Sequence, residues 1–200
     1  GGRIFYYDAG KNWWSRSGVP ENMPVGEIGG PDSEVFYDFG SMYATHPIYK
    51  DKEAHPNSDS GQFLEIGNSV FIEYIKQVDG TFAKLPQSNV DFGGGLERIA
   101  AAKNMNPDVF RVDLLANVVK QIEILSGKRY EDNLVAFRVI TDHIRGAVFM
   151  IGDGVYPGNE QQGYFVRRLL RRAVRFADQL NIKAGEFANL ADGVILTYQV

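Results

Sequence analysis

The residues best suited to chemistry lie in a glycine-rich stretch near the middle of the chain. Residues 93–95 are glycines, and they stand between Asp91 and Arg98. Glycine can turn the backbone sharply, and it lets a ligand approach the backbone closely. We expect a helix after the glycines, and the first turn of a helix offers unpaired N–H groups to an anion. Arg98 adds a permanent cation whose planar fork of donors matches phosphate oxygens, and Asp91 can hold an ammonium group.

The same glycines also fit an ordinary turn between a strand and a helix. Short glycine motifs often occur in such turns without binding anything. In that interpretation Glu97 and Arg98 are solvated side chains on the first turn of the helix. The glycine stretch alone leaves both interpretations open.

A second group of reactive residues is a row of five arginines in the last third of the chain. The row consists of Arg167, Arg168, Arg171, Arg172 and Arg175. An apolar stripe made of Val166, Leu169, Leu170, Ala173, Val174 and Ala177 predicts an amphipathic helix from residue 160 to about residue 180. The row contains no acid, whereas a solvated helix face usually mixes both signs. Because arginine suits phosphate and the wide minor groove of A-form RNA, the row predicts an anionic partner.

Composition and charge narrow the classes of protein. The 44% hydrophobic and 23% charged side chains are ordinary for a folded protein. We find no apolar run of membrane-helix length and no targeting peptide, so we expect a cytoplasmic protein with no membrane partner. Without cysteine, and with three histidines, we expect no zinc site. Residues 1–106 carry 9 basic and 14 acidic side chains and residues 107–200 carry 12 and 11, so nucleic acid is expected to contact the second half.

The sequence pattern predicts that the first half of the chain forms a sheet that leads into the glycine stretch. Strands are expected at residues 3–7, 33–38 and 63–74, and residues 18–32 are expected to form a loop because they are rich in glycine and proline. A turn at Asp79-Gly80 returns the chain toward the glycines, which indicates antiparallel pairing. Asn68 stands within the strongest strand, and a buried amide there needs a hydrogen-bond partner.

The second half reads as helical. Apolar residues recur at intervals of three and four up to a stop at Gly127, and again over about 134–150 and 160–180. The interruption at residues 103–107 places a domain boundary after residue 106. The fold class expected is therefore α+β, with a partial antiparallel sheet followed by a helical domain.

Several stretches together resemble one family. Asp-x-Gly-x-Gly-Leu-Glu-Arg at residues 91–98 resembles motif 3 of the class II aminoacyl-tRNA synthetases, in its alanyl form. Residues 33–38 resemble the family's Ser-Glu-Ile-Phe-Tyr-Asp. A longer signature lies at residues 138–145 and 153–173, where Arg-Val-Ile-Thr-Asp-His-Ile-Arg is followed by Asp-Gly-Val-Tyr-Pro-Gly-Asn-Glu and the arginine helix. The chain resembles alanyl-tRNA synthetase over essentially its whole length.

The resemblance implies a function for each half. Residues 1–106 would be the later part of the class II catalytic domain, and residues 107–200 the first helices of the domain that binds the tRNA acceptor stem. The family reaction joins L-alanine to ATP with the help of Mg²⁺, and then passes alanine to the 3′ end of alanine tRNA.

The resemblance also implies roles for individual residues. The catalytic residues would be Arg98, on an ATP phosphate, and Asp91, on the alanine ammonium. Alanine would be bound by Trp14, Asn68, Asp91 and Gly93, ATP by Gly93, Gly94, Gly95 and Arg98, and tRNA by Asn159, Arg167, Arg168, Arg171, Arg172 and Arg175. Asn159 would help to recognise the G·U pair of alanine tRNA, or would cap the helix that begins at Glu160, or both. The metal ligands are unknown, with Glu34 and Glu65 as guesses.

The chain also departs from the family pattern. Gly67 stands where the family has Trp, residues 26–32 lack the family's two cysteines, and Gly158 replaces Ser. We find no motif 1 and no motif 2, so we expect these 200 residues alone to bind their substrates weakly and not to complete adenylation. The alternative is a non-catalytic RNA-binding relative, which binding of ATP and alanine would distinguish from a synthetase.

Overall fold

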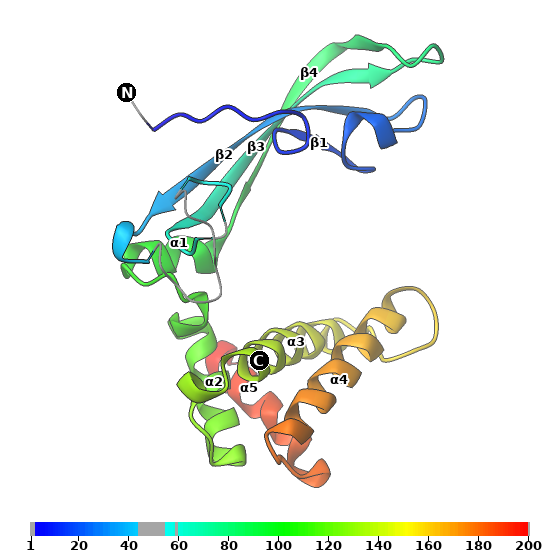
Figure 1. Cartoon of the computed structure of the whole chain (residues 1–200). Helices are drawn as coiled ribbons and strands as arrows, with labels where there is room; N and C mark the ends of the chain where they lie inside the picture. The colour runs from blue at the N-terminus through cyan, green and yellow to red at the C-terminus, as the bar shows by residue number, and fades with distance from the viewer. Residues whose placement is uncertain (1–2, 44–54, 59, 200) are drawn as a thin grey trace. The chain divides into compact units, whose positions relative to one another are not determined.

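The structure, a computed structural model, describes residues 3–43, 55–58 and 60–199 (Figure 1). The chain divides into two compact units, residues 1–109 and residues 110–200. Among the described residues, no helix combines the length and the apolar character needed to cross a membrane.

The first unit is built on a four-stranded antiparallel sheet with the strand order β1-β2-β3-β4. The strands are β1 (Trp13–Ser15), β2 (Ile28–Asp38), β3 (Phe63–Lys76) and β4 (Phe82–Gly94). Helix α1 (Leu96–Lys103) follows β4 and contacts β3, and short 3₁₀ helices span Pro20–Asn22 and Ser41–Tyr43. The predicted α+β class with an antiparallel sheet is confirmed.

The prediction of a loop over residues 18–32 is wrong at its end, because β2 begins at Ile28. The glycines that suggest a loop instead permit close strand packing. A Cβ atom on Gly30 would lie 1.8 Å from the carbonyl oxygen of Phe71, and one on Gly29 would lie 2.7 Å from that of Trp14. The pairing of β2 with β3 is irregular just after Gly29, which is typical of a β-bulge.

The prediction of a strand at residues 3–7 is also wrong. This segment pairs with no strand in the part of the chain that the structure describes, although its side chains suit one. Its contacts run through single side chains instead. The Tyr7 N–H donates to Oδ1 of Asn12 at 3.1 Å, and the Tyr7 hydroxyl hydrogen-bonds Nδ1 of His55 at 3.0 Å. Local β-propensity needs a partner strand to become a sheet.

The second unit is helical, as predicted. Its helices are α2 (Asp113–Ser126), α3 (Leu134–Gly152), α4 (Gln161–Gln179) and α5 (Ala191–Tyr198). Short 3₁₀ helices span Tyr130–Asp132 and Ala184–Leu190. A further 3₁₀ helix, Val109–Arg111, lies where the chain passes from the first unit to the second. Helix α2 ends at Gly127, whose φ of 65° suits glycine best. Helix α3 packs on α4, and α2 packs on α5 (Figure 1).

A single hydrophobic cluster lies between these helices. Phe137 and Ile140 of α3 are fully buried in it, as are Val118 and Ile122 of α2. Helix α4 contributes small side chains that let it approach α3: Ala173 and Ala177. The apolar stripe of α4 is narrower than predicted, since Val174 is 48% exposed. Helix α4 therefore leaves most of its circumference to solvent.

Candidate functional sites

The glycine stretch continues a strand instead of forming a sharp turn. Gly93 pairs with Asn68 and Gly94 pairs with Gly67 within the β3–β4 ladder. Gly95 follows as the residue before α1, with an extended backbone (φ −86°, ψ 103°). None of the three glycines has a positive φ, so the prediction that they turn the chain sharply is wrong. The strand pairing continues up to the helix and leaves no room for a turn.

The glycines instead keep space open. A Cβ atom on Gly95 would lie 3.0 Å from Cδ of Arg98, so glycine lets this arginine fold back over the backbone. Apart from the residues next to it in the chain, no described residue has a heavy atom within 4 Å of the Cβ position of Gly93. The backbone at Gly93 is thus open to a ligand, beside the arginine.

Arg98 reaches back from α1 to β3. Its Nη1 donates to Oε2 of Glu65 at 2.7 Å and to the carbonyl oxygen of Glu65 at 3.1 Å. The two side chains are 47% and 31% exposed, so the ion pair lies near the surface. A phosphate oxygen can replace the Glu65 carboxylate on the same donor, because both are anionic acceptors of similar geometry.

Asn68 has the partner that its place in the strand demands. Its Nδ2 donates to Oδ2 of Asp32 at 3.1 Å, and Asn68 stands opposite Glu34 in the β2–β3 ladder. Burial raises the pKa of the Glu34 carboxyl above its usual value, and the charges of Glu65 and Asp32 raise it further. We call Asp32, Glu34, Glu65, Asn68 and Arg98 the charged cluster.

Asp32 is a candidate site residue that sequence reasoning missed. Its Oδ1 is buried and has no hydrogen-bond partner in the structure, so it can accept from a bound amine. The signal was present in the sequence, because Asp32 and Glu34 alternate along β2 and therefore point to one face of the sheet. The prediction of a loop that ends at residue 32 placed Asp32 outside the strand and concealed that alternation.

A cavity of about 680 Å³ adjoins the charged cluster at Asp32 and Glu34. Its lining combines carboxylates with aromatic rings, which suits a ligand that carries an amine. The lining residues are Arg3, Ile4, Phe5, Tyr6, Tyr7, Asn12, Asp32, Ser33, Glu34, Phe36, Asp38, Pro56, Gln62 and Phe63. The predicted pocket residues Trp14, Asn68, Asp91 and Gly93 are not part of this lining, but Asn68 hydrogen-bonds Asp32, which is part of it.

The two tryptophans have different surroundings. Trp13 stacks on Tyr74 with ring centroids 6.0 Å apart and meets Phe82 edge-on at 5.5 Å. Trp14 pairs with Gly30 and is 43% exposed. Trp13 therefore anchors β1 to the sheet, and Trp14 is the one that remains accessible to a ligand.

Phe92 covers the position where the family pattern has Trp. Two carbons of its ring lie 3.1 Å from the Cβ position of Gly67. Neighbouring residues in a strand point to opposite faces, so this ring lies on the face opposite Asn68. An aromatic ring at Gly67 is thus supplied by the adjacent strand.

The carboxylates of the charged cluster fit a magnesium ion that arrives with a nucleotide. No group of three or more His, Asp or Glu side chains in the described part of the chain could hold a metal ion by itself. A magnesium ion bound to phosphates needs only one or two protein carboxylates. Glu34 and Glu65 would be the carboxylates available to such an ion beside Arg98.

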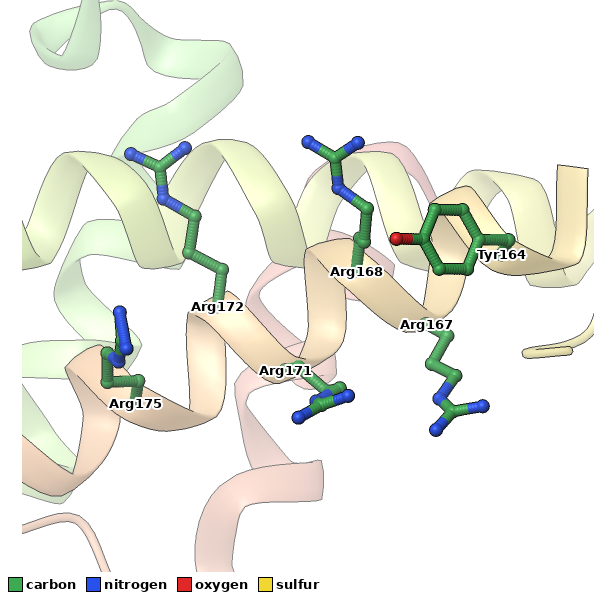
Figure 2. Close-up of a pocket in the computed structure, with 6 residues that line it drawn as sticks. All are labelled: Tyr164, Arg167, Arg168, Arg171, Arg172 and Arg175. Carbon is green, nitrogen blue, oxygen red and sulfur yellow. The ribbon is translucent and has the colours of Figure 1, made fainter. Parts of the chain in front are cut away.

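The arginine row lies on the exposed side of α4. Figure 2 shows Arg168 and Arg172 pointing to one side of the helix and Arg167 and Arg171 to the other. With Tyr164 and Arg175 they line a hollow of about 320 Å³, and the Arg168 guanidinium lies 5.9 Å from the centre of the Tyr164 ring. All five arginines are exposed, and α4 carries no acidic residue before Asp178, so this surface has the positive charge that suits an anionic partner.

Asn159 lies next to this row. The Arg167 guanidinium donates to Oδ1 of Asn159, so the structure brings the predicted base-reading amide and an arginine of the row together. The predicted alternative of a helix cap at Asn159 is wrong. The residue before α4 is Glu160, and no side chain caps the helix. The Asn159 amide oxygen instead accepts from the Arg167 guanidinium.

Comparison with known proteins matches the chain to one family. The family described as tRNA synthetases class II (A) matches residues 2–199. This chain belongs to the class II tRNA synthetases. Among individual proteins, the chain is 40% identical to an alanine–tRNA ligase of Exiguobacterium sibiricum, over 94% of this chain and 22% of that protein.

Two other relatives give the same result. The alanine–tRNA ligase of Bacillus subtilis is 41% identical over 85% of this chain and 21% of its own length. That of Listeria innocua is 45% identical over 76% of this chain and 18% of its own length. The chain thus spans about a fifth of the length of these synthetases. The resemblance to alanyl-tRNA synthetase predicted from residues 91–98 and 138–173 is confirmed.

Proposed function

We propose that this chain is part of an alanine–tRNA ligase, with ATP and alanine bound by the first unit and the acceptor stem of alanine tRNA bound by the second. The observation that carries the proposal is the similarity to alanine–tRNA ligases over 94% of the chain, which includes both the charged cluster and the arginine row. These three relatives are alanine–tRNA ligases, so the similarity does not favour the alternative that this chain is a non-catalytic RNA-binding protein.

The first step to be explained is displacement at the α-phosphorus of ATP, where an alanine carboxylate oxygen attacks and pyrophosphate leaves. Arg98 would donate to a phosphate oxygen and stabilise the negative charge that builds up during the displacement. The open backbone at Gly93 and its neighbours Gly94 and Gly95 would let ATP or alanine lie against the strand. Magnesium bound with ATP, with Glu34 and Glu65 as its nearest carboxylates, would neutralise part of the phosphate charge.

The alanine ammonium requires an anionic acceptor. Asp91 is exposed at the end of β4 and fills this role in our proposal, with Asn68 placing the substrate and Trp14 forming a wall. Asp32 adds a second acceptor, because its Oδ1 is buried and accepts no hydrogen bond from a described residue. Gly93 leaves room for a substrate with a small side chain.

The second unit would hold the acceptor stem. A guanine that faces uracil leaves its N2 amino group available in the minor groove, and the Asn159 amide oxygen can accept from it. The arginines of the row would mostly neutralise phosphates, which positions RNA without reading its sequence. We place the protein in the cytoplasm, in keeping with a chain that contains no cysteine.

Alanine-dependent exchange of pyrophosphate into ATP tests the proposal. We expect exchange with the complete protein that the gene encodes, weaker exchange with serine or glycine, and no efficient exchange with the 200-residue chain alone. Absence of exchange from the complete protein, with RNA binding retained, would replace the proposal by a non-catalytic RNA-binding protein.

A further inference from the structure

We propose that Arg167 is a positioning residue for Asn159: its guanidinium holds the amide so that the oxygen presents its remaining lone pair to a donor on a base. The inference rests on the proposed function of the second unit, in which Asn159 reads a base pair of the acceptor stem. It assigns to one arginine of the row a role in specificity instead of phosphate binding.

The contact fixes the orientation of the amide. A guanidinium can only donate, so the end of Asn159 that faces Arg167 must be the carbonyl oxygen, and Nδ2 must point away. The oxygen has two lone pairs, and Arg167 uses one of them. The second remains for another donor, such as the amino group of guanine.

Without this contact the amide would lose its orientation. Asn159 is exposed, and the last torsion of an asparagine side chain has a broad, roughly two-fold energy profile. A free amide would therefore present its oxygen or its nitrogen to the minor groove. Because one end accepts and the other donates, a freely rotating amide would distinguish poorly between base pairs.

The backbone around Asn159 is held separately. The Gly158 N–H donates to the carbonyl oxygen of Gly163 at 2.9 Å, and the Tyr164 N–H donates to that of Glu160 at 3.1 Å. A Cβ atom on Gly163 would lie 2.8 Å from the Tyr156 carbonyl oxygen, so the loop folds tightly against the first turn of α4. The loop thus fixes where Asn159 stands, and Arg167 fixes which way its amide points.

Another arginine of the row offers a matched control. Arg175 lies on the same helix two turns beyond Arg167. Its side chain is exposed and has no hydrogen bond or ion pair with another described residue. Replacing either arginine by methionine removes one positive charge from the row. Only the change at Arg167 also removes the donor to Asn159.

The experiment measures binding of the 200-residue chain to two acceptor-stem RNA duplexes, one with the G·U pair and one with G·C in its place, by fluorescence anisotropy at fixed salt. Arg167→Met should reduce the preference for the G·U duplex by roughly two- to tenfold, the size of one net hydrogen bond. Arg175→Met should weaken both duplexes alike and leave the preference unchanged. Arg167→Lys keeps a donor and should restore most of the preference.

A double substitution completes the test. Combining Asn159→Ala with Arg167→Met should reduce the preference no further than Asn159→Ala alone, because both changes act through one amide. If Arg167→Met weakens both duplexes equally, Arg167 is a phosphate contact and the inference is wrong. If Asn159→Ala leaves the preference intact, Asn159 does not recognise the G·U pair, and the inference that Arg167 positions its amide is wrong as well. If the unaltered chain binds neither duplex, the proposed function of the second unit fails.

Discussion

Replacing Arg98 by glutamine should separate the stability of the first unit from its affinity for ATP. The Arg98–Glu65 ion pair joins side chains that are 47% and 31% exposed, so losing it should cost only about 0.5–1 kcal/mol of unfolding free energy. A hydrogen bond from a charged donor to phosphate contributes about 1.5–3 kcal/mol. The Kd for ATP should therefore rise about 10- to 150-fold while the fold is retained.

The assay is calorimetric titration with ATP, combined with urea unfolding of the same samples. Arg129→Gln is the control, since it breaks a more exposed ion pair with Asp132 (3.0 Å) in the second unit, whose side chains are 71% and 60% exposed. It should cost no more stability than Arg98→Gln and leave the Kd for ATP unchanged. Unaltered ATP binding by the Arg98→Gln variant would refute the assignment of Arg98. A loss of stability above about 3 kcal/mol would refute our description of the pair as a surface contact.

Three further predictions concern Glu34, the helical core and the arginine row. Glu34→Gln should raise the unfolding free energy at pH 7 by less than about 1 kcal/mol, because folding opposes the charge of a carboxyl whose pKa it raises. In urea unfolding, this gain should shrink as the pH falls through the pKa of Glu34 in the folded state, and it should vanish below the unfolded-state pKa of 4.5. A gain in unfolding free energy that persists at pH 3 would contradict this prediction. Gly193→Ala should cost about 1–3 kcal/mol of unfolding free energy, because the new Cβ would lie 2.8 Å from Cα of Val118 and 2.9 Å from the carbonyl oxygen of Asn117. If urea unfolding instead gives wild-type stability, α5 can shift to accept the methyl group. Arg175→Met should lower the slope of log Kd against log salt for acceptor-stem RNA by roughly 0.7–0.9, and an unchanged slope would mean that Arg175 contacts no phosphate.

Much of the helical unit could be predicted from sequence because helix formation depends on local pattern. Phe137 and Ile140 follow the helical period and are buried, and Gly127 ends α2 where its conformation requires glycine. The start of β2 could not be predicted in the same way. Gly29 and Gly30 favour a loop by local propensity, but pairing with distant strands overrides that preference, and only glycine fits the close contacts formed there.

The candidate sites could be predicted only in part. The need of Asn68 for a partner followed from its place in a strand, whereas the identity of that partner, Asp32, depends on the register of two strands. Arg98 was identified from its motif, but its ion pair with Glu65 crosses 33 residues of sequence. Asn159 and Arg167 are eight residues apart, yet a loop and two helical turns separate them, so their contact is a property of the folded loop.

The most direct test of the account is the charging of two tRNAs by the complete protein that the gene encodes. One is alanine tRNA, and the other is the same tRNA with G·C in place of its G·U pair. The account predicts that alanine is attached to the first in an ATP-dependent reaction that Arg98→Gln abolishes, and that the second is charged poorly. Attachment of another amino acid, or equal charging of both tRNAs, would contradict it.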